Sequence, residues 1–201
     1  MHTQYNQPNL TDPNRSFGFS MIEVLVTILI LMIGLLGLAG LQSRAFTTQL
    51  ESYQRSQALI LLKDMADRLE SNRRNAAAYI NDNPLGVGGA CPGTGTVAEQ
   101  DLCDWHNALM GSAEGSATTA MIGARGCIFQ EVAPATGAAA TYQIVVSWQG
   151  LNSTAPPDTS TASSPGKCGE GDYKDRDGNV NEALHRAISI PVSIADLAPP
   201  P

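Results

Sequence analysis

The feature that most constrains this chain is an uncharged, mostly apolar run of twenty residues, Val24–Ser43. As an α-helix the run would extend over ~30 Å, the thickness of the hydrocarbon core of a bilayer. A buried core helix is the alternative, but it fits so long and uniform a run poorly. A secretory signal peptide would have a shorter apolar region closed by a small-residue cleavage site. The run therefore predicts a membrane-spanning helix.

Three glycines recur at every third position within this run, at Gly34, Gly37 and Gly40. Small residues on a membrane helix let a second helix approach closely. Each glycine also weakens the helix by ~1 kcal/mol relative to alanine. We therefore expect these three positions to form a helix-packing surface.

A single carboxylate, Glu23, stands at the edge of the run. Such a group is costly to bury unless it is paired or protonated, and by itself it would only mark the membrane boundary. It lies, however, within the segment GFSMIEVLV, residues 18–26. This segment resembles the processing site of type IV pilins and pseudopilins, where a Gly precedes a Phe, a Glu is fifth in the mature chain, and an apolar helix follows.

The resemblance implies a leader peptide, residues 1–18, that stays cytoplasmic. A prepilin peptidase would cut between Gly18 and Phe19 and methylate the new N-terminus at Phe19. Glu23 would then meet the N-terminal amine of a neighbouring subunit, since two charges that are costly singly become tolerable as a pair. The chain would cross the inner membrane once, with its bulk in the periplasm, and later reach the pilus on the cell surface.

A helical pattern continues beyond the apolar run, because no Pro or Gly occurs between Arg44 and Ile80. We expect one helix from Phe19 to about Ala78, with residues 19–43 in the membrane or filament core and residues 44–80 forming an amphipathic periplasmic half. The apolar stripe does not keep a strict heptad, which favours a globular head on one face over a coiled coil. The stripe consists of Phe46, Leu50, Tyr53, Leu61, Met65 and Leu69.

Residues 81–201 predict a separate head. Residues 81–84 should stop the helix, residues 85–89, 92–95 and 151–171 should be loops, and residues 102–110 a short helix. Alternating or apolar patterns predict strands over residues 126–132, 141–149 and 188–194, and Pro191 places the last of these at an edge or bulge. Consecutive strands favour an antiparallel sheet. The expected fold class is α+β and type IV pilin-like, a long N-terminal helix packed on a small antiparallel sheet.

Short head segments also resemble one branch of the family, the PilV minor pilins or type IV pilus modification proteins. They are residues 101–105, 126–128, 145–150 and 184–189. The branch implies a minor pilin that joins the pilus or primes its assembly, with the prepilin peptidase, other minor pilins, the major pilin and the inner-membrane assembly machinery as partners. A minor pseudopilin of type II secretion shares the N-terminal signature. A membrane-tethered periplasmic domain and an adhesin using residues 151–171 are further alternatives.

Four cysteines, Cys91, Cys103, Cys127 and Cys168, all lie in the head. An even number beyond a membrane helix predicts two disulfides in an oxidising periplasm, and three pairings are possible. We favour Cys91–Cys103, which closes a local loop, and Cys127–Cys168, which ties a strand to the long loop. Zinc on Cys103 and His106 is the competing hypothesis, but the sequence has no Cys-x-x-Cys.

Other ligand and catalytic classes are disfavoured. Residues 175–179 resemble the middle of a calcium loop, but Tyr173 and Leu184 occupy ligand positions, so we expect a solvated turn and no metal. No nucleophile-elbow, P-loop or dinucleotide-binding pattern is present, and we expect His185 on the surface, so neither an enzyme nor a cofactor is predicted. With 12 basic and 19 acidic residues the chain also lacks the basic footprint of a nucleic-acid binder.

Overall fold

A computed structural model describes residues 18–111, 121–135 and 138–195, apart from the side chain of Asp82. Most of the expected leader, residues 1–17, lies outside the described residues. The chain divides into two compact units, residues 1–45 and residues 46–201. The described residues of the first unit are a short non-helical start, residues 18–20, and a helix, whereas the second unit contains the sheet and the remaining helices.

Helix α1, Met21–Ser71, begins directly after Ser20, whose carbonyl accepts hydrogen bonds from the amides of Glu23 and Val24 at 3.0 and 3.3 Å. The expected helix end near Ala78 is wrong, because α1 stops at Ser71 and a 3₁₀ segment, Arg73–Tyr79, follows. Asn72 (φ −107°) and Asn75 (φ −113°) leave helical geometry, and their side chains hydrogen-bond each other at 2.9 Å. Asparagine offers its neighbours this alternative to helical bonding, so it ends the helix.

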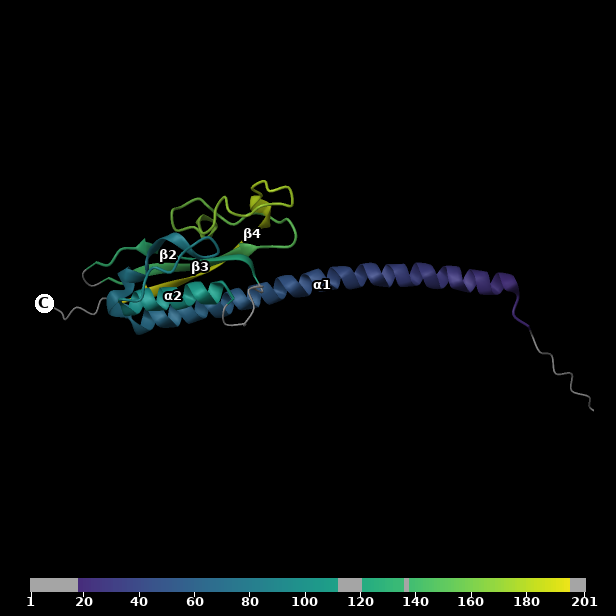
Figure 1. Ribbon diagram of the computed structural model, residues 1–201, viewed down its shortest axis with the longest axis horizontal. Helices are drawn as coiled ribbons and strands as arrows, with labels where there is room; N and C mark the ends of the chain where they lie inside the picture. Colours follow the sequence, from purple (N-terminus) through teal and green to yellow (C-terminus); the bar gives the residue numbers. More distant parts are fainter. Residues whose placement is uncertain (1–17, 112–120, 136–137, 196–201) are drawn as a thin grey trace, which may run out of the picture. The chain divides into compact units, whose positions relative to one another are not determined.

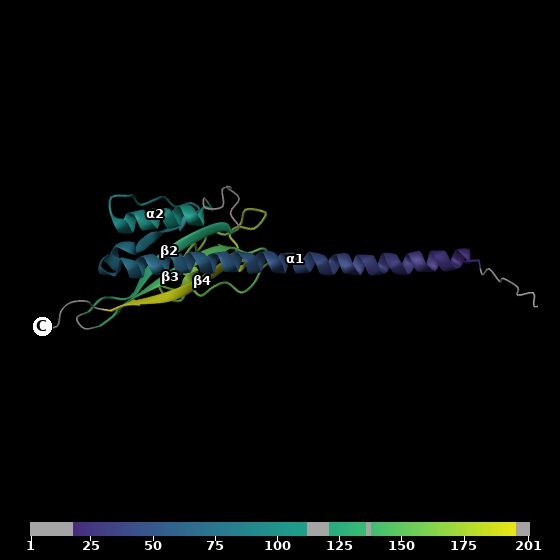
Figure 2. The same cartoon turned by 90° about the horizontal axis from the view of Figure 1, so that it is seen from below.

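Four antiparallel strands form one sheet in the order β1-β2-β3-β4. They are β1 (Asn81–Gly86), β2 (Ile122–Val132), β3 (Ala140–Gln149) and β4 (His185–Ile194). The predicted α+β class is confirmed, and Pro191 does lie on an edge strand, β4. Figures 1 and 2 show α1 and α2 side by side on one face of this sheet.

Strand β1 was not predicted, because residues 81–89 read as a helix stop and a loop. Asn81 explains the difference: its side-chain oxygen accepts a hydrogen bond from the Ile128 amide at 2.8 Å, and its side-chain nitrogen donates to the Gly126 carbonyl at 3.2 Å. The pairing with β2 shifts register between Asn81 and Leu85. A polar side chain thus replaces part of the backbone ladder, which a pattern of apolar alternation cannot reveal.

Helix α2, Val97–Leu109, begins earlier than the predicted residues 102–110. Thr96 and Glu99 form a capping box at its start, with each side chain accepting from the other residue's amide. This arrangement satisfies two amide groups that a helix N-terminus otherwise leaves unpaired. Trp105, on the inner face of α2, is fully buried and donates a hydrogen bond to the Leu61 carbonyl of α1 at 3.0 Å.

The main hydrophobic core lies between the sheet and these two helices. Helix α1 contributes Ala58, Leu62, Met65, Ala66 and Leu69, α2 contributes Leu102, Trp105 and Leu109, and the sheet contributes Ile128, Ile144, Val146 and others. A smaller cluster, Cys127, Val145 and Cys168, lies on the opposite face of the sheet. The long connection from β3 to β4 therefore covers the face that the helices leave open.

The structure contradicts the expected surface position of His185, which is completely buried. Its Nδ1 lies 2.9 Å from a Glu182 oxygen, and its ring centroid lies 4.5 Å from that of Tyr173. The Tyr173 hydroxyl donates a hydrogen bond to the Ser147 hydroxyl at 2.8 Å. Burial lowers the pKa of His185 from its ordinary value of 6.5, against the opposing effects of Glu182 and the Cys168 backbone. The residue anchors the end of the long connection to the sheet.

Candidate assembly interface

The expected cleavage site lies directly before α1. Gly18, Phe19 and Ser20 precede the first helical residue, and all three are exposed. A Cβ at Gly18 would meet nothing within 4 Å, and Phe19 is 84% exposed. Packing against the described residues therefore does not require a glycine at this position. An exposed, non-helical backbone is the form that a peptidase needs to bind a chain in its active site.

Glu23 lies in the first turn of α1 and is exposed. A negative charge there is favoured by the partial positive charge at a helix N-terminus. Among the described residues Glu23 forms no ion pair. Its carboxylate therefore has no cationic partner among residues 18–111, 121–135 and 138–195.

The apolar run is uncovered within the chain. Every residue of α1 from Met21 to Ala45 is exposed, and α1 is the one helix of the described chain that is long and apolar enough to cross a membrane. A Cβ at Gly34, Gly37 or Gly40 would meet nothing within 4 Å. So long an exposed apolar surface requires a membrane or other helices to cover it. The glycines leave room for close helix packing, and no described residue occupies that room.

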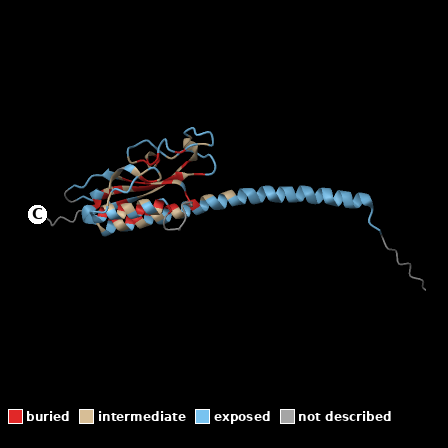
Figure 3. Ribbon diagram, viewed as in Figure 1, coloured by how far each residue is buried: buried red, intermediate tan, exposed pale blue. Residues whose placement is uncertain are grey.

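Along the part of α1 in the second unit, Figure 3 shows exposed residues among buried ones, and four of the exposed residues form a second apolar surface. We call it the outer seam, and it consists of Phe46, Leu50, Tyr53 and Ile60, which are 63%, 39%, 48% and 59% exposed. The prediction that the head would cover Phe46, Leu50 and Tyr53 is wrong. At 100° per residue these side chains point away from the head-packing face of α1, which consists of Ala58, Leu62, Met65 and Leu69.

The seam residues are spaced by four, three and seven positions. This is the spacing at which one helix packs along another. The head-packing face and the outer seam were merged into one stripe in the sequence prediction, because both contain apolar residues at helical spacing. Their separation matters for function, since it leaves the back of α1 open for contact with another helix.

The four cysteines form the two disulfides favoured from the sequence, Cys91–Cys103 and Cys127–Cys168. The first ties the loop before α2 to α2 itself, and the second ties β2 to the long connection. The zinc hypothesis fails in this geometry, because Cys103 is in a disulfide and the Nδ1 of His106 accepts a hydrogen bond from the Gly86 amide at 3.0 Å.

Residues 175–179 form a closed turn. One oxygen of Asp175 accepts hydrogen bonds from the amides of Asp177 and Asn179 at 3.0 and 2.9 Å, and Gly178 has φ +83°. This Asx-type turn satisfies the carboxylate with backbone amides. Within the described ranges no three His, Cys, Asp or Glu side chains are grouped so as to hold a metal ion.

Sequence reasoning missed a polar cluster at the end of α1. Arg68 lies 3.1, 3.0 and 3.3 Å from carboxylate oxygens of Asp64, Asp101 and Asp104, and the hydroxyl of buried Tyr79 donates to Asp101. Burial, followed by the hydrogen bond to Asp101, raises the pKa of Tyr79 to about 12. The cluster fastens α1, the 3₁₀ segment and α2 together. Asp64 and Arg68 form a local pair four residues apart, which the sequence does suggest. Asp101 lies 33 positions from Arg68 and 22 from Tyr79, so no local motif signals the rest of the cluster.

Comparison with known families gives two matches. The prokaryotic N-terminal methylation motif matches residues 13–39, and the family described as type IV pilin Tt1218 matches residues 40–86. No curated protein and no solved structure matches the chain. The two matched segments adjoin each other and include the expected cleavage site, all of α1 and strand β1. Residues 13–86 are therefore similar in sequence to type IV pilins.

Proposed function

We propose that this chain, which carries the sequence signatures of the type IV pilin superfamily over residues 13–86, is a filament subunit made as a membrane-anchored precursor. A prepilin peptidase cuts it between Gly18 and Phe19 and methylates Phe19. The observation that carries the proposal is the combination of a methylation motif with an apolar helix that no described residue covers. The membrane covers that helix before assembly, and other subunits cover it afterwards.

Glu23 acts in assembly by pairing with the N-terminal amine of a neighbouring subunit. Support comes from its position in the first turn of α1, its exposure and its lack of an ion pair within the described chain. Removing either charge alone would leave the other uncompensated in an apolar environment, at a cost of several kcal/mol. The pairing therefore selects subunits that are cleaved and in register.

The outer seam extends this role into the second unit. In a filament whose α1 helices pack against one another, the exposed faces of Phe46, Tyr53 and Ile60 become covered while the head stays on the opposite side of its own helix. The apolar area that this contact removes from water stabilises the assembly by about 25 cal/mol per Å². An isolated periplasmic domain would have no use for such a surface.

We further propose a minor pilin of the PilV type, whose partners are the major pilin, other minor pilins and the inner-membrane assembly machinery. Support comes from the segments that resemble this branch, which meet in the head core. Gly126 lies directly under the Trp105 ring, where a Cβ would approach to 2.4 Å, and Trp148 is buried in the same cluster. A type II secretion pseudopilin is the second candidate, because it requires the same N-terminal signature.

Substitution of Glu23 tests the proposed function. In a strain that assembles filaments from this chain, Glu23→Gln removes the charge while keeping nearly the same shape. We expect the variant to be cut after Gly18 and to stay in the membrane, but to be lost from sheared filaments by roughly tenfold or more. Quantitative mass spectrometry of membrane and filament fractions measures both amounts.

The matched control is Glu70→Gln, which removes an exposed carboxylate of the same helix outside the apolar run. It should leave the filament fraction unchanged. Equal incorporation of Glu23→Gln and the wild-type chain would contradict the pairing. Recovery in type II secretion filaments, with none in pili, would select the pseudopilin alternative.

A further inference from the structure

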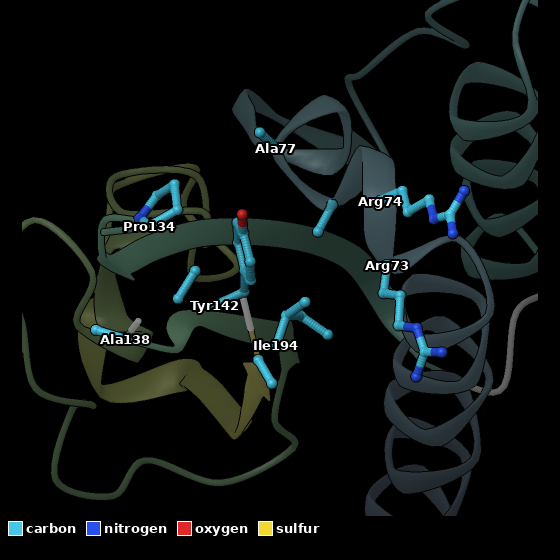
Figure 4. A pocket seen from close by; sticks show the side chains of 10 residues that line it. Arg73, Arg74, Ala77, Pro134, Ala138, Tyr142 and Ile194 are labelled. Atoms are coloured by element: carbon cyan, nitrogen blue, oxygen red, sulfur yellow. The ribbon is translucent and has the colours of Figure 1, made fainter. Parts of the chain in front are cut away.

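A cavity of about 390 Å³ opens between the 3₁₀ segment and the ends of β3 and β4 (Figure 4). Its floor is apolar and consists of Ala76, Ala77, Ala138, Ala140 and Ile194, with Pro134 beside them. Arg73 and Arg74 stand on one side and Tyr142 on the other. None of the residues that line this cavity is used in the proposed function.

The two arginines have no partner within the described part of the chain. Both are exposed, and neither forms an ion pair or a hydrogen bond there, whereas Arg68 and Arg125 are both paired with carboxylates. Glu70 lines an adjoining cavity with Arg73 but forms no ion pair with it. Their place just after α1 suits the negative end of the helix dipole. That accounts for the positive charge but not for the cavity beside it.

Tyr142 adds a hydrogen-bond donor to the wall. Burial raises the pKa of its hydroxyl, so the group keeps its proton at neutral pH, and Gln130 hydrogen-bonds to it. Two guanidinium groups and a phenol suit a carboxylate, which arginine binds in a forked geometry. The alanine floor suits small or branched apolar side chains. A bare inorganic anion would leave most of this volume and all of the floor unused.

We propose that this cavity binds an acidic peptide segment of a neighbouring subunit, with a carboxylate against Arg73 and Arg74 and an adjacent apolar side chain on the alanine floor. The charge is complementary, since two unpaired cations stand out on a chain of net charge −7. The inference rests on the proposed function only for the origin of the segment. Binding of the peptide itself does not require a filament.

The test uses the full chain in detergent and two labelled peptides, acetyl-Ala-Glu-Val-Glu-Ala-amide and its Gln counterpart. Fluorescence anisotropy measures the affinity for each. We expect the Glu peptide to bind roughly tenfold more tightly than the Gln peptide, and the combined Arg73→Gln and Arg74→Gln variant to lose about that factor. The combined Arg55→Gln and Arg176→Gln variant is the matched control, because both residues are exposed arginines without an ion pair in the described chain.

Several results would overturn the proposal. They are equal affinity for the two peptides, no binding of either, an equal loss in the control variant, or competition by inorganic phosphate as strong as that by the Glu peptide. Binding that appears only after removal of residues 196–201 would assign the cavity to the chain's own end. Concentration-dependent dimerisation abolished by the Arg73 and Arg74 changes would instead support the proposal, with a second copy of this chain as the neighbouring subunit. Cleavage after Gly18, scored separately, would remain intact in each case.

Discussion

At the scale of single residues, the contact between Gly126 and Trp105 sets how closely α2 approaches the sheet. A Cβ at position 126 would lie 2.4 Å from the Trp105 ring and 2.7 Å from a Leu109 methyl group. We expect Gly126→Ala to lower the free energy of unfolding by about 1–3 kcal/mol through overpacking. Urea denaturation of the full chain in detergent measures the change. Ala139→Ser, which adds one atom to an exposed side chain, is the control, and an equal effect of both would contradict the account.

His185 predicts a dependence of stability on pH. Because burial lowers its pKa in the folded protein below the ordinary 6.5, the unfolded chain takes up a proton more readily. The free energy of unfolding should therefore be highest above about pH 6.5 and should fall as the pH drops through that value toward the folded-state pKa. His185→Gln should reduce this slope. Unfolding measured at about pH 7.5 and about pH 5 tests it, and identical slopes in both proteins would contradict it.

Candidate functional residues differ in whether the sequence alone can suggest them. Gly18, Phe19 and Glu23 could be proposed from the sequence because together they form a local pattern along the chain. The burial of His185, and the cluster of Arg68 and Tyr79 with Asp101, could not. Those contacts join residues far apart in sequence, so they depend on how α1, α2 and the long connection pack.

At the scale of elements, the two disulfides should differ in their contribution to stability. Cys127–Cys168 closes a separation of 41 residues and is buried at both ends, whereas Cys91–Cys103 closes a separation of 12. Loop entropy alone predicts that the longer link stabilises by roughly 1 kcal/mol more. Replacing each pair by alanines and comparing urea midpoints measures this. A larger loss from the Cys91 and Cys103 pair would contradict the expectation.

The helices and strands also show which sequence signals are sufficient to predict secondary structure. Alternating apolar residues correctly predicted β3 and β4, because one face of each strand packs into the core shared with α1 and the other face carries mostly polar or small side chains. The predicted end of α1 was wrong, and β1 was not predicted at all. In both places asparagine side chains determine the backbone conformation through hydrogen bonds. Polar residues that substitute for backbone partners carry no periodic signal.

At the scale of the whole molecule, the outer seam should serve assembly and not folding. Tyr53→Ser combined with Ile60→Ser removes apolar contact area from side chains that are about half exposed. We expect a change in unfolding free energy within about 0.5 kcal/mol but a severalfold loss from filaments. Leu62→Ser, on the head-packing face, should instead destabilise the fold by about 2–5 kcal/mol. A seam variant that unfolds as readily as Leu62→Ser would contradict this division of α1.

The class of fold followed from the order of patterns along the chain, a long apolar helix and then alternating strands. The direction in which α1 presents its second apolar face could not be predicted from the sequence, because the apolar residues of two faces of one helix recur at the same spacing. Only the position of the head distinguishes the covered face from the open one. The surface that we assign to assembly is therefore known from the structure alone.

The mature N-terminus tests the central claim most directly. Intact-mass measurement and N-terminal sequencing of this chain, from cells with and without prepilin peptidase, determine where it starts. The account predicts a chain that begins at methylated Phe19 only when the peptidase is present, and the uncut precursor when it is absent. An uncut chain in both strains, or a start at any other residue, would contradict it and would leave a tethered periplasmic domain as the better description.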